Sequence, residues 1–405
     1  LKLALRNVLR NRRRSLLTII SRGGGYFLLS AMAAMTEGSY SNMIDLFTRD
    51  HTGHVQVHQG NYLERPSLYK TIKQPEHLMN TIAQQKNVIA VAPRIYGPSL
   101  AYGGHKSSPA NVIGINPVRE AETTLLKQKL KQGSYLTASM NDDGYYSAMI
   151  GKTIAKNLKL NIGDELVLIS QGIDGSIAND VFQVTGIVGT KDSFERQNVY
   201  LSIEAMGQFL NIHNQVHELA IRLEHQDQAR EFSQRPILNQ LDQRLSIDPW
   251  QVVESAFYNG MQADKKGNYT SMGIIIFIVA IGVLNAVLMG TLERTHEFGV
   301  LKAIGTRPLG IFRLILLESS ILALASSLLG AILVLPLNYW MATSGIQMPT
   351  PVDMGGITFD TMRGEISWFS MGMPVLVVVG STLAVSLYPA IRASRISPLK
   401  AMQDL

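Results

Sequence analysis

Four long apolar segments constrain the fold of this chain more than any other feature. A helix that crosses a bilayer needs about 20 mostly apolar residues, and residues 269–292, 311–341 and 366–391 meet this requirement. A further segment at 15–36 is weaker, because Arg22 and the run of glycines after it interrupt the apolar stretch. The sequence therefore predicts a membrane protein with four spanning helices and an all-α membrane part.

The segment at 15–36 has a rival interpretation as a cleaved signal peptide. Arg12-Arg13-Arg14 precedes an apolar run, as in twin-arginine export signals, and Ala31-Met32-Ala33 resembles a cleavage site. An arginine inside the apolar region argues against this interpretation, since that region of a signal is normally uninterrupted. A retained first span is the favoured interpretation.

Basic residues predict the orientation of the spans. Cytoplasmic loops of membrane proteins carry an excess of Lys and Arg, and here such residues gather before the first span, between the second and third spans, and after the fourth. The connection at 342–365 holds only Arg363. We therefore expect three segments to lie in the cytoplasm, namely residues 1–14, 293–310 and 392–405. Residues 37–268 and 342–365 are expected on the periplasmic side.

The net charge and the cysteine count exclude several classes of function. The net charge of +6 arises from residues beside the apolar spans, so it indicates membrane orientation and no nucleic-acid partner. No cysteine is present, which excludes disulfides, thiolate metal sites and a cysteine nucleophile.

Residues 37–268 are polar enough to form a separate extracytoplasmic domain. Alternating apolar and polar residues predict strands at 54–58, 165–170 and 181–188, and helical patterns lie between such strands. This mixture predicts a large α+β domain. A helical pattern over 249–268 leads into the second span, which predicts a stiff helix joining the domain to the membrane.

Two motifs within this domain suggest ligand chemistry but are weak. Gly151-Lys152-Thr153 ends like a phosphate loop, yet Tyr146 occupies the position where that loop requires glycine. His51, His54 and His58 could bind a metal, although polar residues on one face of a strand are usually solvated. We expect no cofactor, no metal and no catalytic residue in this chain.

Arg22 and Glu318 are charges placed inside predicted spans, where charges are normally functional or paired. Each lies seven residues from the cytoplasmic start of its span, a depth of about 10 Å at 1.5 Å per residue. The matched depth predicts an intramembrane charge pair between the first and third spans. The alternative is that each side chain snorkels separately to the surface. The small residues at 23–25 would allow another helix to approach closely.

The connection between the second and third spans is charged and compatible with a helix. Glu293 and Glu297 are spaced i, i+4, while Phe298, Leu301 and Ile304 share an apolar face. An amphipathic helix on the membrane is the plain interpretation. Paired glutamates fit an anionic membrane surface poorly, so a helix seated in a groove of a partner protein is the favoured one.

The pattern E-R-x-x-E-F-G-x-L-K-A-x-G over 293–305 resembles the coupling element of ABC-transporter permeases of the MacB/LolC/LolE/FtsX type. The basic start at 7–14, Glu318-Ser319, the tail at 388–398 and the outer-domain stretches at 150–164 and 199–206 are also similar to this family. The resemblance covers nearly the whole chain and is closest to lipoprotein-releasing LolC and LolE.

The resemblance implies a transport subunit that transmits mechanical movement. Two permeases, either identical copies or paralogues, would pair with an ABC ATPase dimer that binds ATP and Mg. It also implies a periplasmic domain in two lobes, with a membrane-proximal lobe at 37–116 and 215–268 and an inserted lobe at 117–214. The residues implied in ATPase coupling are Glu293, Arg294, Glu297, Phe298, Gly299, Leu301, Lys302, Ala303 and Gly305.

The resemblance favours a lipoprotein or other lipid-like substrate handled at the bacterial inner membrane. Residues 53–58 are more similar to LolC and LolE than to drug exporters, and the ATPase fused to the N-terminus of MacB-type chains is absent from this sequence. An FtsX-like regulator of cell-wall hydrolases, a MacB-like efflux permease with a separate ATPase, and a receptor without an ATPase are the alternatives. A periplasmic adaptor is left open. Substrate contacts are expected at the outer ends of the first two spans, at Met43, Ile44, Phe47, Phe257 and Met261.

Overall fold

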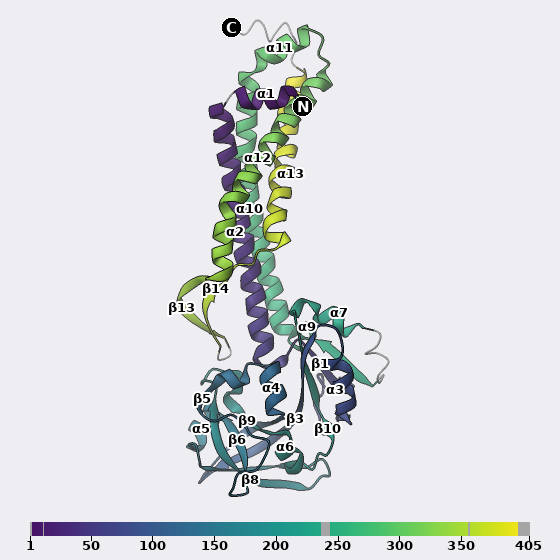
Figure 1. Ribbon diagram of the computed structural model, residues 1–405, viewed down its shortest axis with the longest axis vertical. Coiled ribbons are helices and arrows are strands. Elements are labelled where there is room, and N and C mark those ends of the chain that lie inside the picture. Colours follow the sequence, from purple (N-terminus) through teal and green to yellow (C-terminus); the bar gives the residue numbers. More distant parts are fainter. Residues whose placement is uncertain (1, 11, 236–243, 355–356, 396–405) are drawn as a thin grey trace. The chain divides into compact units, whose positions relative to one another are not determined.

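The computed structural model describes residues 2–10, 12–235, 244–354 and 357–395 of the chain. It divides the chain into two compact units (Figure 1). The first unit comprises Leu1–Asn42, Met261–Met348 and Thr361–Leu405, and the second comprises Met43–Gly260 and Pro349–Asp360. Each unit is described separately below.

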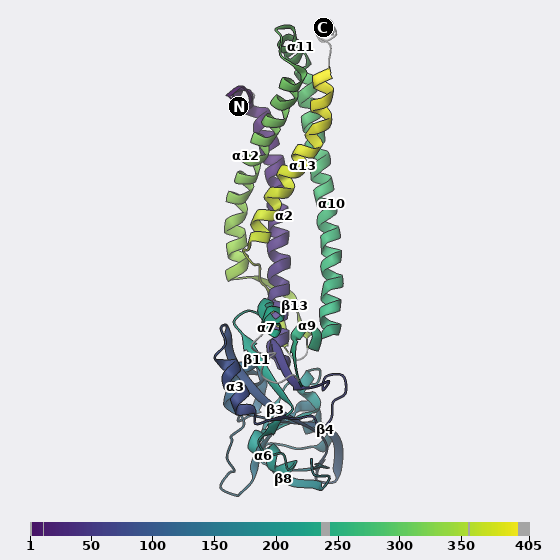
Figure 2. The same ribbon diagram turned by 90° about the vertical axis from the view of Figure 1, so that its right-hand side faces the viewer.

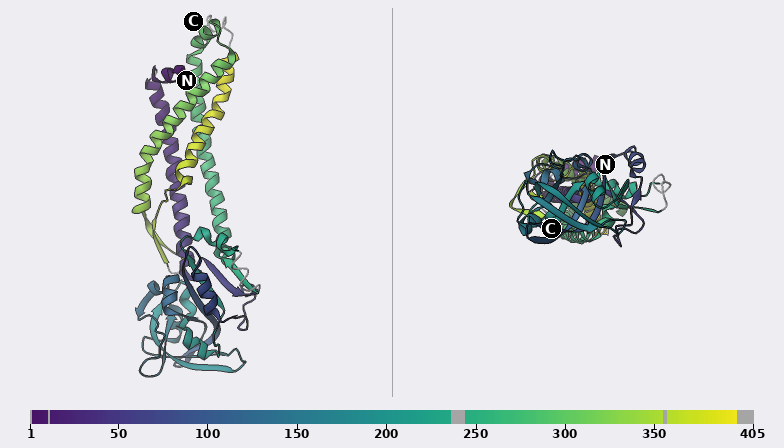
Figure 3. Two further views of the ribbon diagram at one scale, coloured as in Figure 1. Left: turned by 45° about the vertical axis from the view of Figure 1, so that its right-hand side comes forward. Right: turned by 90° about the horizontal axis from the view of Figure 1, so that it is seen from below.

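Four helices in the described part are long and apolar enough to cross a membrane, as predicted. They are α2 (Arg12–Phe47), α10 (Ser255–Glu293), α12 (Pro308–Thr343) and α13 (Trp368–Arg395). Within the first unit these helices run side by side in Figures 1 and 2 and in the left-hand view of Figure 3. Helices α2, α10 and α12 extend beyond the predicted spans at both ends, whereas α13 begins at Trp368, inside its predicted span, and extends beyond its predicted end. The depth of the bilayer along the helices stays a prediction. Part of the predicted tail, 396–405, lies outside the described residues.

Small residues determine how α2 packs in the first unit. A Cβ on Gly23 would lie 3.1 Å from the backbone oxygen of Ser326 in α12, and a Cβ on Gly330 would lie 2.6 Å from the ring of Tyr26. A Cβ on Gly25 would lie 2.9 Å from Val279 of α10. The predicted close approach at the glycine run is therefore confirmed, and it involves two neighbouring helices.

Two short helices complete the first unit. Helix α1 (Lys2–Arg10) contacts α12, and α11 (Thr295–Ala303) follows α10 after a break at Arg294. Helix α12 begins at Pro308, the position in a helix where proline is best tolerated because its missing N–H is not needed.

The second unit is built on one mixed sheet of ten strands in the described part. Its strand order is β12-β1-β11-β3-β4-β9-β6-β8-β5, and β7 pairs with β3 and β8. Most pairs are antiparallel, while β4 with β9 and β6 with β8 are parallel. The strands are β1 (Val55–Gln59), β3 (Val88–Gly103), β4 (Lys106–Ile115), β5 (Leu130–Gly133), β6 (Tyr146–Gly151), β7 (Glu165–Gln171), β8 (Ile177–Val188), β9 (Asn198–Ser202), β11 (Glu218–Leu223) and β12 (Leu245–Pro249).

Short helices cover this sheet and connect its strands. They are α3 (Pro75–Ala83), α4 (Pro117–Thr123), α5 (Lys152–Leu158), α6 (Ile203–Phe209), α7 (Ala229–Ser233) and α9 (Trp250–Val253), with a π-helical turn η1 (Thr48–Thr52) and short η2 (Leu126–Lys129), η3 (Phe194–Gln197) and η4 (Gln226–Gln228). Two separate ladders pair β2 (Ile72–Lys73) with β10 (Gln215–Val216), and β13 (Ile346–Met354) with β14 (Ile357–Met362).

The predicted mixture of strands and helices in the outer domain is confirmed. Strands β1, β7 and β8 lie where the alternating patterns predict them. Alternate side chains enter the core in β7, whereas β1 also buries its polar residues Gln56 and His58, which are therefore not solvated. The sheet passes through residues of both predicted lobes, and the two-lobed division stays a prediction. The predicted stiff helix is confirmed as α10, although it begins at Ser255, after the separate helix α9.

Candidate coupling site and anchoring network

The predicted coupling segment, residues 293–305, folds into the end of α10, a break and α11. Gly305 has a φ of +97°, a conformation that glycine adopts without steric cost. Its N–H donates to the carbonyl of Lys302, and the N–H of Thr306 donates to that of Leu301. This arrangement terminates α11 and turns the chain toward α12, as a glycine after a helix commonly does.

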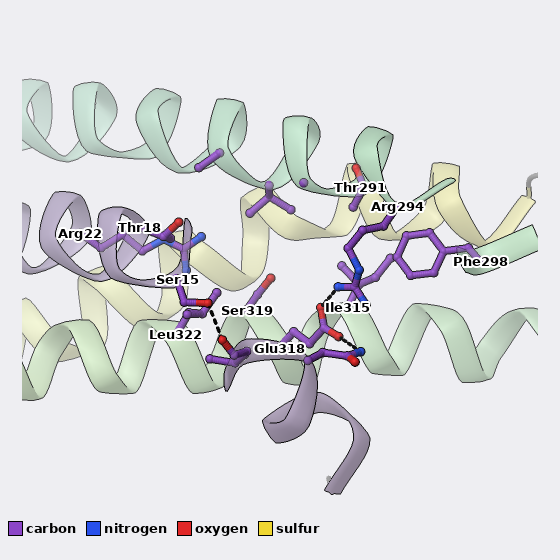
Figure 4. A pocket seen from close by; sticks show the side chains of 15 residues that line it. Ser15, Thr18, Arg22, Thr291, Arg294, Phe298, Ile315, Glu318, Ser319 and Leu322 are labelled. Atoms are coloured by element: carbon purple, nitrogen blue, oxygen red, sulfur yellow. Dashed lines mark hydrogen bonds and ion pairs between the residues drawn. The ribbon is translucent and has the colours of Figure 1, made fainter. Parts of the chain in front are cut away.

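A cluster of five polar side chains, Asn7, Arg10, Arg294, Glu297 and Glu318, ties α11 to its neighbours; we call it the ionic cluster. Arg294 donates from Nη1 to Glu318 at 2.6 Å and from Nε to Glu297 at 2.8 Å. The other oxygen of Glu318 accepts from the amide of Asn7 at 2.7 Å, and Arg10 forms an ion pair with Glu297. Figure 4 shows the side chain of Arg294, from the break after α10, meeting that of Glu318 from α12. Helix α1, the α10–α11 break and α12 are thereby joined.

The charges of the ionic cluster stabilise one another. Burial by itself would lower the pKa of Arg294, but the hydrogen bonds to Glu318 and Glu297 outweigh it and raise that pKa. Partial burial would raise the pKa of Glu297, yet the hydrogen bond and charge of Arg294 lower it overall. Both groups therefore remain ionised around neutral pH.

Apolar contacts seat α11 against its own unit. Phe298 is 1% exposed and packs with Ile311 and Ile315 of α12 and with Ala390 and Ala393 of α13. The guanidinium of Arg294 lies over the Phe298 ring at 5.2 Å. The groove that holds this face of α11 is thus formed by the chain itself.

This seating corrects the predicted apolar face of the coupling segment. Phe298 and Leu301 face the helices, but Ile304 is 76% exposed because it lies at the end of α11, where the chain turns away. Val300 on α11 is also exposed, at 41%. These two apolar side chains form an outward surface that the predicted coupling residues did not include.

The remaining predicted coupling residues divide by exposure. Gly299 is buried, and Lys302 is half-buried. Glu293, Ala303 and Gly305 are exposed. Asn7 and Arg10 were not predicted as site residues, since nothing in the sequence shows that the start of the chain contacts a segment 287 residues later.

The structure does not contain the predicted pair of Arg22 and Glu318. Both residues line one cavity (Figure 4), but the two carboxylate oxygens of Glu318 bind Asn7 and Arg294. Arg22 is 2% exposed, and its Nε and Nη1 have no hydrogen-bond partner among the described residues. Arg22 therefore does not snorkel to the surface either. Equal depth in the membrane made the pair of Arg22 and Glu318 feasible, but the carboxylate of Glu318 binds Arg294 instead.

The predicted substrate-contacting residues are only partly available to a ligand. Phe47 and Phe257 stack with ring centroids 3.9 Å apart and an interplanar angle of 7°. Met43 is half-buried, and Ile44 and Met261 are buried. The stacked pair joins the ends of α2 and α10 that belong to the second unit.

A buried ionic network anchors η1, the turn that follows α2, to the sheet of the second unit. Arg94 of β3 makes two hydrogen bonds to Glu120, at 2.7 and 3.1 Å, and one to Glu218 at 2.8 Å. It also donates to the backbone oxygen of His51 at 2.5 Å. Lys129 bonds Glu195 at 2.6 Å and forms an ion pair with Asp50 in η1.

This network holds its charges despite complete burial. Burial would lower the pKa of Arg94, but the charge of Glu120 raises it far above its ordinary value. Burial would raise the pKa of Glu218, and the charge of Arg94 lowers it overall. A buried charge that loses its partner is strongly destabilising, so the network fixes η1 firmly.

The three histidines have structural hydrogen bonds. His54 Nδ1 accepts from the N–H of Leu223 at 3.1 Å, and His58 pairs with Glu218 at 3.3 Å. His51 lies between Asp50 and Glu254. Among the described residues, no group of three or more His, Asp or Glu side chains could hold a metal ion.

Close packing of the backbone explains why residue 151 is a glycine. A Cβ at this position would lie 2.0 Å from the backbone oxygen of Glu195. Glycine is thus required by the approach of another backbone segment, which removes the main reason to assign a phosphate loop there.

Comparisons with known proteins agree with this architecture. A family model of the MacB-like periplasmic core domain matches residues 15–235, more than half of the chain, and a model of the FtsX-like permease C-terminal region matches residues 269–398. The first match includes the segment at 15–36.

Relatives named as transport proteins resemble the chain over most of its length. LolC of Xylella fastidiosa, a lipoprotein-releasing system transmembrane protein, is 26% identical over 353 residues, which is 81% of each chain. LolE of Haemophilus influenzae is 21% identical over 82% of each chain. A macrolide export ATP-binding/permease protein MacB of Rhodopirellula baltica is 22% identical, covering 81% of this chain and 51% of that protein. The chain is a member of the MacB/LolC/LolE-like family of ABC-transporter permeases.

Proposed function

We propose that this permease converts ATP hydrolysis in a separate ATPase subunit into movement of its periplasmic domain. The observation that carries the proposal is the continuity of α10, one helix from Ser255 to Glu293 with α11 directly after it. A continuous helix is stiff along its axis. Displacement of α11 would therefore be passed along α10 toward residues of the second unit.

The docking surface for the ATPase is the exposed side of the coupling segment. Val300 and Ile304 supply apolar area, with Glu293, Ala303 and Gly305 exposed nearby in the chain. Interfaces usually combine such an apolar centre with a polar rim. The ionic cluster and Phe298 would hold α11 to the helices, so that a push on α11 moves them together. ATP and Mg would bind to the partner ATPase dimer, and no cofactor is proposed for this chain.

The movement would reach the sheet through the turn η1 after α2 and through the residues just before α10. Arg94 fastens the His51 carbonyl to β3 and β11, and the N–H of Trp250 donates to the carbonyl of His54 at 3.0 Å. His51 also contacts Glu254, the residue directly before α10, at 3.3 Å. Rigid contacts of this kind would pass a displacement on instead of absorbing it.

The orientation proposed for the chain follows from its basic residues. Residues 1–14, 293–310 and 392–405 would face the cytoplasm and 342–365 the periplasm, with the bilayer crossed by helices alone. The periplasmic domain would comprise the two lobes predicted from the family, and a second permease copy or a paralogue would complete the transporter.

The substrate proposed is a lipoprotein or another lipid-like molecule extracted at the inner membrane. Two relatives with matching coverage are named for lipoprotein release. Phe47 and Phe257 would contact acyl chains after their stack opens, with Met43, Ile44 and Met261 beside them in sequence. A MacB-like export of drugs or peptides is the second candidate, because a macrolide-export relative covers the same share of this chain.

The ATPase partner can be tested by co-purification with the products of neighbouring ABC ATPase genes. We expect an ATPase to co-purify with the wild-type permease, and Val300→Asp with Ile304→Asp to abolish this. Ile177→Asp, at an exposed residue of the second unit, is the control and should have no effect. A wild-type permease that binds no ATPase would refute the proposal.

The substrate can be tested with the co-purified transporter in proteoliposomes. Release of a triacylated lipoprotein to a soluble acceptor on addition of ATP is expected. ATP-driven loss of a macrolide from the vesicles, without lipoprotein release, would favour the second candidate.

A further inference from the structure

The cavity around Arg22 holds a positive charge that the described residues do not neutralise. It has a volume of about 80 Å³ and lies among α1, α2, α10, α11 and α12. A single water molecule needs about 10–15 Å³ by this measure. The cavity therefore has room for several waters or for one small polyatomic ion.

Three charged side chains line the cavity, namely Arg22, Arg294 and Glu318. Glu318 is neutralised by Arg294, to which it bonds at 2.6 Å, and its other oxygen accepts from Asn7. Arg22 keeps its proton under all ordinary conditions. The lining thus carries one unbalanced positive charge, which is costly inside a helical bundle.

The donors of Arg22 are poised for an acceptor. Arg22 is only 2% exposed, and its Nε and Nη1 have no hydrogen-bond partner among the described residues. Figure 4 shows the Arg22 guanidinium beside Thr18, with Ser15 and Ser319 further along the same cavity. Nε and Nη1 lie on opposite edges of the guanidinium, so each can donate separately to an oxyanion or to a bridging water, and hydrogen bonds of a guanidinium to phosphate oxygens are strengthened by charge.

We propose that the Arg22 cavity binds a phosphate-type oxyanion. Its source would be the headgroup of a membrane phospholipid or free inorganic phosphate. Exposed basic residues at Arg6, Arg12 and Arg13, on α1 and at the start of α2, would concentrate either one near the cavity. The bound oxyanion supplies the missing counter-charge and fixes α1 and α2 to α12. The cavity shares Arg294, Phe298 and Glu318 with the coupling site but includes neither Val300 nor Ile304 of the proposed docking surface, and substrate handling is not involved.

The test is native mass spectrometry of the full-length, delipidated protein, titrated separately with dioleoyl phosphatidylglycerol and with sodium phosphate. Dioleoylglycerol, which has no phosphate, is the lipid control. Binding of the phospholipid but not of dioleoylglycerol identifies a headgroup. Binding of inorganic phosphate at the same affinity identifies the free ion as the ligand.

Variants connect the binding to Arg22. Arg22→Gln should weaken binding by about tenfold or more, as expected for loss of charge-assisted hydrogen bonds. Arg22→Lys should restore part of it, and Arg313→Gln, at an exposed arginine of α12, should leave it unchanged. Ser319→Val keeps the charge of Arg22, narrows the cavity and removes a hydroxyl from its lining, so it should also weaken binding. This variant keeps the test possible if Arg22→Gln does not fold. Equal binding by the wild type, Arg22→Gln and Ser319→Val, or no binding of either probe, would overturn the proposal.

Discussion

The guanidinium of Arg294 donates to the carboxylate of Glu318 at 2.6 Å, joining the break after α10 to α12. The two residues are 24 positions apart in the chain and both are largely buried. This ion pair, with Asn7 on the other oxygen of Glu318, fixes the base of α11. It makes the position of α11 depend on three other helices of the first unit.

Breaking this pair should loosen α11. We expect Arg294→Gln to lower the stability of the protein by about 1.5–3 kcal/mol, because a hydrogen bond to a charged group is lost and Glu318 keeps its charge. Thermal unfolding in detergent measures the effect, and Arg313→Gln, at an exposed arginine, is the control.

A charge exchange distinguishes the observed pair from the one predicted by depth. Arg294→Glu combined with Glu318→Arg should be more stable than either single variant. Arg22→Glu combined with Glu318→Arg should show no such recovery. The opposite ranking would mean that Arg22 is the true partner of Glu318.

The glycine run of α2 should be sensitive at one position and tolerant at the next. A side chain at Gly23 would meet the Ser326 backbone at 3.1 Å, whereas no described atom lies within 4 Å of a Cβ on Gly24. Gly23→Leu should destabilise the protein by about 1–3 kcal/mol, as overpacking does. Gly24→Leu is the matched control, and equal melting temperatures for the two variants would contradict the packing of α2 against α12.

Acid should destabilise the second unit through His54. Burial lowers the pKa of His54 from 6.5 to about 4. The unfolded chain thus binds a proton that the folded chain excludes between these two values. The stability from neutral His54 is complete above pH 6.5 and is lost as the pH falls toward 4, by about 3 kcal/mol in total.

The measurement is the unfolding midpoint of the full chain between pH 7 and 4. His54→Gln should reduce the loss of stability over this range, and His105→Gln, at an exposed histidine, should not change it. Some dependence should persist in His54→Gln, since burial also lowers the pKa of His217. An unchanged pH profile in His54→Gln would show that His54 titrates normally.

The proposed orientation can be tested by single-cysteine labelling, because the chain has no cysteine of its own. Cysteine placed by Ile177→Cys should react with a membrane-impermeant maleimide in intact spheroplasts. Cysteine placed by His296→Cys should react only after the membrane is permeabilised. Both positions are exposed in the structure. Labelling of both in intact spheroplasts would contradict a cytoplasmic coupling segment.

The sequence predicted the elements whose signals are local. Continuous apolar runs predicted α2, α10, α12 and α13, because a bilayer imposes both length and apolarity on a span. Alternation predicted strands such as β7. The family resemblance rested on the coupling segment, which is also a local pattern.

The tertiary structure decided which side chains meet. Depth along the helices made Arg22 a fitting partner for Glu318, but depth does not specify how each helix is rotated about its axis. Because of that rotation, the carboxylate of Glu318 accepts hydrogen bonds from Arg294 and Asn7, while Arg22 lines a cavity. Likewise, the apolar pattern of α11 could not separate Phe298, which its own helices cover, from Ile304, which they leave exposed. Composition and periodicity determine which segments are helices in a membrane, whereas the pairing of their charges depends on packing between residues hundreds of positions apart.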